Sequence, residues 1–236
     1  MAFGLCLLPA ACGDGSSGTA SSGTAPEEPP GPVDPARFTR VVDNPFLPLA
    51  PGTRMTYEGR TDEGLERIVV EVTPATRTVM GVTCLVVRDT VTVGGEVVED
   101  TFDWYAQDLD GNVWYFGEAT TAYEKGKPAG TEGSWEAGVD GARPGIVMKA
   151  HPEVGESYRQ EYYRGHAEDR ADVLSLTATA TVPFGSFRDA VMTRDYTPLE
   201  RDKVEHKYYA RGVGFVLEEE VEGGDTRVEL VRVERA

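Results

Sequence analysis

The stretch from Val97 to Glu118, VVEDTFDWYAQDLDGNVWYFGE, decides the fold class of this chain. Apolar residues of its first half fall on one face of a strand: Val98, Phe102, Trp104 and Ala106. Polar residues fill the alternate positions: Glu99, Thr101, Asp103 and Gln107. This period of two is typical of a strand with one buried and one solvated face. Asp110-Gly111-Asn112 suits a tight turn, so the stretch predicts a β-hairpin whose aromatic face is buried.

The same period marks further strands on both sides of this hairpin. Residues 66–73 (ERIVVEVT) and 83–93 alternate in the same way, and Gly94-Gly95 predicts a second hairpin turn. Helix has little support, because no window shows a sustained apolar period of 3.6 residues. We therefore expect a mainly β protein, built as a curved antiparallel sheet of half-barrel or barrel-like form.

The second part of the chain repeats motifs of the first at an offset of about 104 residues. VGESYRQEYY matches PGTRMTYEG in placing glycine before an aromatic strand. Arg-Asp-Tyr at 194–196 matches Arg-Asp-Thr at 88–90, and Tyr-Tyr-Ala at 208–210 matches Trp-Tyr-Ala at 104–106. This predicts one β domain over residues 41–236 with an internal duplication, 44–118 and 152–234. The alternative is that two unrelated meanders merely look alike. Glycine and proline break any period over 119–151, which predicts an irregular lid, binding loop or connector.

The first 40 residues differ in composition from the remainder. Residues 1–12 resemble the end of a signal peptide with a lipobox, in which Cys12 receives the lipid. Pro9 and the lack of a basic n-region depart from that pattern, and a plain apolar N-terminus is the alternative. Residues 13–40, rich in Gly, Ser, Thr and Pro, predict a disordered linker. We therefore expect an extracytoplasmic protein, either lipid-anchored on the outer face of the bacterial cell membrane or secreted.

The charge and the cysteines narrow the choice of partners. The net charge is −17, of which −4 lies in residues 1–35 and −13 in the remainder. This argues against nucleic acid and anionic lipid surfaces as partners. After Cys12 the body contains one cysteine, Cys84, which is expected to be a core residue and leaves no partner for an internal disulfide. We expect a monomer without a resident cofactor.

Polar residues at predicted inward positions nominate a ligand site. Asp100 shares the Phe102/Trp104 face, and His206 shares the face of Tyr208. Asp89 and Asp195 take matching inward positions in the two halves. Because a buried charge is costly unless it is paired, these residues need partners. One possibility is that the partners lie within the protein, and a second is that a bulge turns these residues outward. The third is that the four residues form the polar floor of a ligand cavity whose aromatic walls are Trp104, Trp135 and Tyr208.

Two further chemistries are nominated by residue type. Asp108, Asp110 and Asn112 resemble the opening of a calcium loop, although a DxDGN sequence is also common as a bare hairpin turn. His151, His166 and His206 are too far apart in sequence for a zinc motif, and nucleophile-elbow, phosphate-loop and dinucleotide motifs are all absent. Hydrolysis by carboxylates and His206 is therefore the weakest hypothesis.

Four stretches carry a resemblance to known proteins: NPFLPLAPGTRMTYEG, VEDTFDWYAQDLDGNVWYFGE, GSWEAGVDGARPGIVMKAHP and VEHKYYARGVGFVLEE. Together they resemble a group of bacterial secreted proteins and lipoproteins of unassigned function, over residues 44–219. More loosely, Tyr-Tyr-Ala-x-Gly-Val-Gly-x-Val is similar to lipoprotein-carrier-like and lipocalin-like envelope proteins with a curved antiparallel sheet. That likeness implies an apolar small ligand, by analogy of fold alone.

These observations leave three hypotheses for function. The first is a non-enzymatic envelope protein that binds a hydrophobic or amphipathic small ligand on its concave face. The second is a structural or protein-interaction lipoprotein with a filled core. The third is the hydrolase. A connected, aromatic-lined cavity favours the first, and a filled interior favours the second.

Overall fold

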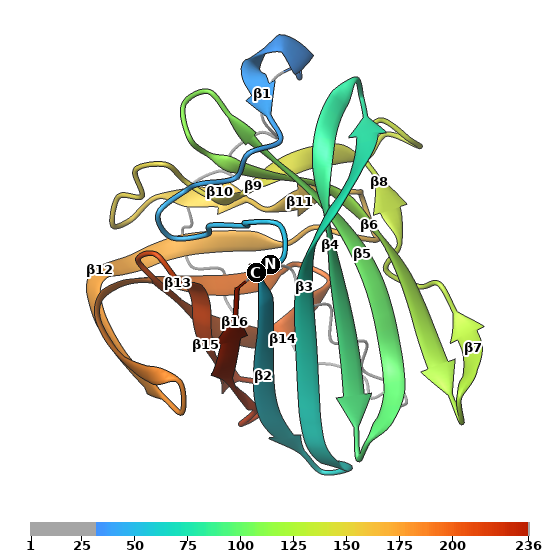
Figure 1. Cartoon of the computed structure of the whole chain (residues 1–236), viewed down its shortest axis with the longest axis vertical. Coiled ribbons are helices and arrows are strands. Elements are labelled where there is room, and N and C mark those ends of the chain that lie inside the picture. The colour runs from blue at the N-terminus through green and yellow to red at the C-terminus, as the bar shows by residue number, and fades with distance from the viewer. Residues whose placement is uncertain (1–31, 236) are drawn as a thin grey trace, which may run out of the picture.

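The computed structural model describes residues 32–235, which are almost entirely β-structure (Figure 1). Within that range α-helix is absent, and one 3-10 turn, η1 (Pro35–Arg37), precedes the strands. The strands of the first half are β1 (Phe38–Thr39), β2 (Arg54–Thr61), β3 (Gly64–Val79), β4 (Val82–Val93), β5 (Glu96–Asp108) and β6 (Val113–Glu124). The middle strands are β7 (Lys127–Gly130), β8 (Trp135–Glu136), β9 (Arg143–Met148), β10 (Ser157–Arg159) and β11 (Glu161–Tyr162). The last strands are β12 (Arg170–Val182), β13 (Gly185–Thr197), β14 (Glu200–Ala210), β15 (Gly214–Glu222) and β16 (Arg227–Glu234).

Two antiparallel meanders form one curved, nearly closed sheet. Strands β2 to β6 pair in sequence order, as do β12 to β16, and β16 pairs with β2 to join the two meanders (Figure 1). The far edges are β10, paired with β12, and β11, paired with β9. Only Gln160 separates β10 from β11, so the chain itself crosses the seam of the barrel. The predicted barrel-like antiparallel fold is confirmed.

Local sequence explains the long hairpins. In β3, the side chains of Ile68, Val70 and Val72 are buried, as the period of two predicts. Gly94 and Gly95 form the β4–β5 turn with φ of 59° and 92°, a region that glycine enters without steric cost. The predicted hairpin from Val97 to Glu118 is present as β5 and β6.

One end of the barrel is closed by residues 42–49, which we call the plug. Phe46, Leu47 and Leu49 of the plug are buried in the core. Asn44 holds the plug in place: its Nδ2 donates to the carbonyl oxygens of Gly111 (2.9 Å) and Lys149 (3.1 Å). Its Oδ1 accepts from the backbone N–H of Phe46 (2.8 Å) and Leu47 (3.2 Å). Such complete pairing is what a buried amide requires.

Matching contacts occur at equivalent places in the two halves. The amide of Gly52 (φ 88°) donates to Val72 O at 2.8 Å, and the amide of Gly155 (φ 91°) donates to Val173 O at 2.9 Å. Asp89 lies opposite Thr101, and Asp195 lies opposite Glu205. These correspondences support the internal duplication, which stays a prediction.

Two predicted boundaries were wrong. The segment 119–151 is not irregular, because β6 extends to Glu124 and β7, β8 and β9 all pair with β6. The predicted linker ended at residue 40, yet Phe38 packs at 5.5 Å, edge-on, against the rings of both Trp114 and Phe116. An aromatic anchor of this kind orders the end of a polar segment. Residues 1–31, including Cys12 and most of the predicted linker, lie outside the described residues.

Candidate functional site

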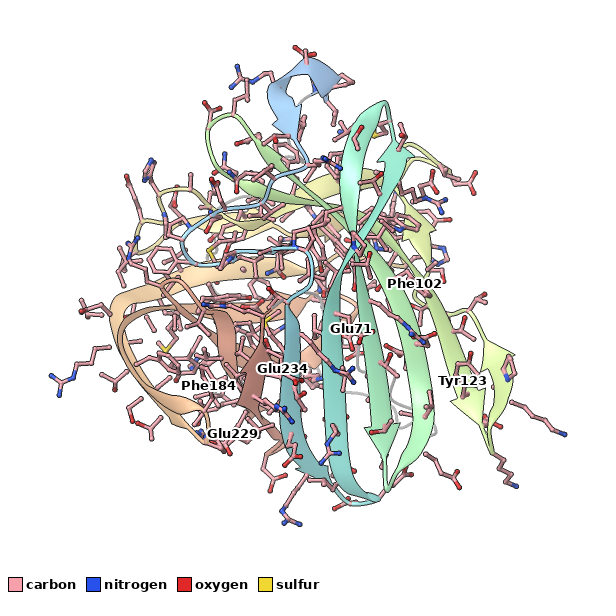
Figure 2. All side chains as sticks on the ribbon, in the orientation of Figure 1. Glu71, Phe102, Tyr123, Phe184, Glu229 and Glu234 are labelled. Carbon is pink, nitrogen blue, oxygen red and sulfur yellow. The ribbon has the colours of Figure 1, made fainter. Side chains whose placement is uncertain are left out.

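The inner face of β5 is the face that the sequence pattern assigned to solvent. Thr101 and Asp103 are 4% exposed and lie opposite the buried residues Asp89 and Val87 of β4. Phe102, between them, is 39% exposed on the outside (Figure 2). The predicted inward position of this aromatic face was therefore wrong, although Trp104, on the same face as Phe102, is 4% exposed and belongs to the buried core. Arginines shield the outward aromatic rings: the guanidinium of Arg77 lies 4.1 Å from the centre of the Trp104 ring.

Five carboxyl side chains line the inner face of the first half. We call them the inner acid cluster: Glu66 on β3, Asp89 on β4, Glu99 and Asp103 on β5, and Glu118 on β6. Asp103 lies five residues before Asp108, whose turn contacts the plug. At about 3.3 Å per residue, about 16 Å of strand separates Asp103 from that turn.

The contacts of the cluster leave it incompletely paired. The Tyr115 hydroxyl lies 2.7 Å from Asp103 Oδ1 and 3.0 Å from Glu118 Oε2. A hydroxyl carries one proton, so it donates to only one of these carboxylates at a time. Glu66 is 1% exposed and Asp89 is 8% exposed, and among the described residues neither Glu66 Oε2 nor Asp89 Oδ1 has a hydrogen-bond partner.

Burial and mutual repulsion raise the pKa values of these acids. Burial, followed by the charges of Asp103 and Glu99, raises the pKa of Asp89 well above its ordinary value. Burial is also the main cause that raises the pKa of Glu99 to about 7, against a hydrogen bond from Thr101 that lowers it. The pKa of Asp103 rises to about 7, chiefly through burial. These carboxyl groups therefore bind protons more tightly than ordinary Asp and Glu side chains do.

Aromatic rings border the cluster. Tyr105 stacks on Tyr115 with ring centres 4.9 Å apart, and Trp135 meets Tyr115 edge-on at 5.5 Å. Tyr105 is 1% exposed, and its hydroxyl has no hydrogen-bond partner within residues 32–235. Burial, followed by the charges of Asp103, Glu118 and Asp89, raises the pKa of the Tyr105 hydroxyl.

The second half places a lysine among its acids. Lys207 Nζ lies 3.3 Å from Glu205, 3.4 Å from Glu218 and 3.8 Å from Asp195, and its side chain is 4% exposed. Burial alone would lower the pKa of Lys207, but these three charges raise it overall. Asp195 also accepts hydrogen bonds from Gln160 Nε2 (3.0 Å) and Thr193 Oγ1 (2.5 Å). This half therefore supplies its own cation.

The structure separates the residues that the sequence nominated for a ligand site. Asp89, Trp135 and Asp195 lie inside the barrel, as expected. Four others lie on the outer face, which corrects their predicted position: Asp100, Trp104, His206 and Tyr208.

Each outward residue has a partner there. Arg88 holds Asp100 through two hydrogen bonds of 2.7 and 3.1 Å. The Tyr208 hydroxyl donates to Glu219 at 3.0 Å, and His206 lies opposite Arg194 and Glu219 in the sheet. The His206 side chain is on the opposite face of the sheet from the inner acids, because side chains alternate along a strand.

The Asp108–Asn112 motif forms a self-contained turn. Asp108 Oδ1 accepts from the backbone N–H of Asp110 and Asn112, and Oδ2 accepts from Asn112 Nδ2 and Trp114 Nε1, at 2.8 to 3.0 Å. Asp110 pairs with Arg37 at 2.7 Å, and Asn112 Oδ1 accepts from Ala150 N at 2.9 Å. The hairpin thus uses the oxygens that a calcium ion would need, and calcium binding stays an untested prediction.

Several residues of this interior were not predicted. Glu99, Asp103 and Lys207 sit at positions that the alternation assigned to solvent, because the flanking aromatic residues marked the other face as buried. One available signal was the register itself: Asp89 was correctly placed inward, and its cross-strand partner Thr101 belongs to the same face as Asp103. Cys84 was correctly predicted to be buried, and burial raises the pKa of its thiol to about 12.

Comparison with known proteins adds two structural neighbours. No protein-family model and no curated protein sequence matches the chain. A protein from Bacteroides fragilis, described as exported and as having a YmcC-like fold, is 16% identical and covers 80% of this chain and 99% of its own, with a TM-score of 0.48. A protein from Parabacteroides distasonis, described as a lipoprotein, is 14% identical and covers 80% and 98%, with a TM-score of 0.43. Within residues 32–235, no helix has the length and apolar character needed to cross a membrane.

Proposed function

We propose that this protein is an extracytoplasmic envelope protein, lipid-anchored through Cys12, that binds an amphipathic small molecule inside its barrel. One observation carries the proposal: the inner face combines stacked aromatic rings with buried polar atoms that lack partners in the described residues. Both features are typical of small-molecule sites, which pair apolar walls with a few polar groups.

The energetic argument starts from the unpaired atoms. A buried polar group without a hydrogen bond costs about 1–3 kcal/mol, and a charged one costs more. Asp89 Oδ1 and the Tyr105 hydroxyl are two such atoms on neighbouring strands of the inner face. An interior with a purely structural role is expected to pair or replace such groups. A ligand that supplies the missing partners recovers this energy on binding.

The N-terminal sequence supports the location. Ala10-Ala11-Cys12 provides a lipobox-like cleavage site, and the Gly/Ser-rich residues that follow provide a flexible tether. Attachment through more than one acyl chain gives stable anchoring, whereas a single chain binds only marginally.

A second candidate function is a structural or protein-interaction lipoprotein. The filled plug end favours it, because Phe46, Leu47 and Leu49 pack there in the buried core. The hydrolase hypothesis has no comparable support, since His206 lies on the outer face, away from the inner acid cluster.

Native mass spectrometry of the protein purified from its own envelope tests the proposal. We expect a discrete small-molecule adduct that is released on denaturation, in addition to the covalent lipid mass. The Cys12→Ser variant is the matched control, and it should lose the lipid mass but keep the adduct. Protein that arrives without any adduct, and that binds no amphipathic probe when unliganded, would favour the structural role instead.

A further inference from the structure

Equivalent interior positions carry opposite charges in the two halves. In the first half, Asp103 lies opposite Val87, two residues before Asp89. In the second half, Lys207 lies opposite Thr193, two residues before Asp195. The register therefore puts Asp103 where the second half has Lys207, beside an inward aspartate in both cases.

The second half shows what a cation does at this position. Lys207 Nζ lies within 3.8 Å of Asp195, Glu205 and Glu218 and forms a compact ionic group. Asp195 forms an ion pair with Lys207 and accepts hydrogen bonds from Gln160 and Thr193. Neither of its oxygens is both buried and unpaired among the described atoms.

The first half has the acids without a lysine of its own. Burial raises the pKa of Glu66, and the charge of Lys203, from β14 of the second half, acts to lower it. Strands β2 to β6 contain no lysine, and their five arginines belong to the outward-facing positions of these strands: Arg54, Arg60, Arg67, Arg77 and Arg88. The counterpart of Lys207 is a further acid, Asp103, and Asp89 Oδ1 is left without a partner in residues 32–235. The Tyr105 hydroxyl, an independent polar group that is 1% exposed, is also unpaired there, as is the hydroxyl of its counterpart Tyr209 in the second half.

We propose that the inner acid cluster binds the positively charged amino group of an amphipathic ligand, which takes the place that Lys207 Nζ has in the second half. This inference rests on the proposed function and names its ligand class. Asp89 and Asp103 provide charge-assisted acceptors, and the Tyr105 hydroxyl provides a neutral one. The stacked rings of Tyr105 and Tyr115 offer apolar contact to the rest of the molecule.

An organic cation fits the cluster better than a metal ion. Metal ligands converge on one point at 2.0–2.6 Å, whether the metal is zinc, magnesium or calcium. In residues 32–235 no three His, Cys, Asp or Glu side chains are grouped in that way. An ammonium group, in contrast, donates three hydrogen bonds at about 2.8 Å to acceptors that stand further apart.

Isothermal titration calorimetry with three probes of equal chain length tests this inference. The full-length chain, refolded from urea to remove any bound molecule, is titrated with octylamine, octanol and octanoate. We expect octylamine to bind at least about tenfold more tightly than octanol, because it forms a charged pair in a buried site, and octanoate to bind least.

Variants locate the site within the barrel. Asp103→Lys introduces an internal cation like that of the second half, and it should abolish the preference for octylamine while preserving or raising the melting temperature. Asp89→Asn should weaken octylamine at least about tenfold. Asp195→Asn is the matched control, because Lys207 already serves that carboxylate, and octylamine binding should not change.

The outcomes separate this inference from the proposed function. If octanol or octanoate binds as well as octylamine, or if Asp103→Lys leaves the preference intact in a folded protein, the amine inference is wrong while amphipathic binding stands. If no probe binds, and native mass spectrometry finds no adduct, both proposals fail.

Discussion

The inner acids predict an unusual dependence of stability on pH. Burial raises the pKa of Glu99 from its ordinary value of 4.5 to about 7 in the folded protein. A carboxyl group whose pKa is raised by folding keeps its proton longer in the folded state than in the unfolded state. Its stabilising contribution is therefore complete below pH 4.5 and is lost as pH rises through 7.

The magnitude follows from this difference in proton affinity. Each tenfold change in the proton-binding constant, which is one pKa unit, is worth about 1.4 kcal/mol. Glu99 alone therefore lowers the free energy of unfolding by about 3 kcal/mol between pH 4.5 and pH 8. Asp103 and Glu218, each with a pKa of about 7, act in the same direction. The pKa of Glu205 is lowered, despite its burial, by Lys207 and Lys203, so its opposite effect falls below pH 4.5 and outside this window.

Urea unfolding of the unliganded protein at several pH values measures this slope. With a denaturant slope of about 2 kcal/mol per molar urea, Glu99 alone should lower the midpoint by about 1.5 M between pH 4.5 and 8, and Asp103 and Glu218 should lower it further. Glu99→Gln, which keeps the size of the side chain, should reduce the slope of unfolding free energy against pH by the contribution of about one bound proton. A midpoint that stays level or rises over this range would refute the reasoning that these acids are buried and unneutralised.

Three further predictions concern single side chains. Asp89→Asn should raise the melting temperature of the unliganded protein, because it removes a buried carboxyl group whose ionised form lacks a cation. Asp195→Asn should lower the melting temperature, because it breaks a paired network; equal shifts in a thermal scan would contradict this contrast. Asp108→Ala should destabilise the protein by about 2–4 kcal/mol in urea unfolding, since four donors lose their acceptor, and added Ca²⁺ should leave the wild-type melting temperature unchanged. Gly145→Ala should cost at least about 2 kcal/mol, because its Cβ would meet the backbone of Gln160 at the barrel seam; a neutral result would show that the seam is loose.

The sequence predicted the strands better than it predicted their faces. Alternation and turn residues located the β5–β6 hairpin and the Gly94-Gly95 turn, because these are local properties of the chain. The face of β5 was assigned from Phe102 and Trp104, on the premise that aromatic residues point inward. Arginine cations cover these rings on the outside, and such long-range pairings are not visible in a single strand.

The candidate site was predictable only in part, for a related reason. Asp89 was placed correctly because Val87 and Val91 flank it on the inward face, so the acid stood out as an exception, and Asp195 was placed correctly because it takes the corresponding position in the second half. Glu99 and Asp103 form a regular polar face, which is also the pattern of an ordinary solvated strand. Hydrophobic periodicity distinguishes two faces, but it does not identify which one is inside when the interior itself is polar.

The contrast between Asp103 and Lys207 shows that the two halves of this polar interior differ in how their buried acids are neutralised. Two halves with the same strand register and the same inward aspartate would be expected to solve the problem of buried charge in the same way. The second half does so within its own chain, since Lys207 brings Asp195, Glu205 and Glu218 into one ionic group. The first half retains the acids, adds Asp103 at the lysine position and leaves Asp89 Oδ1 unpaired among the described residues. A protein under selection for stability alone has an available remedy in a single lysine, so its absence from this one half is best explained by a cation that arrives with a ligand.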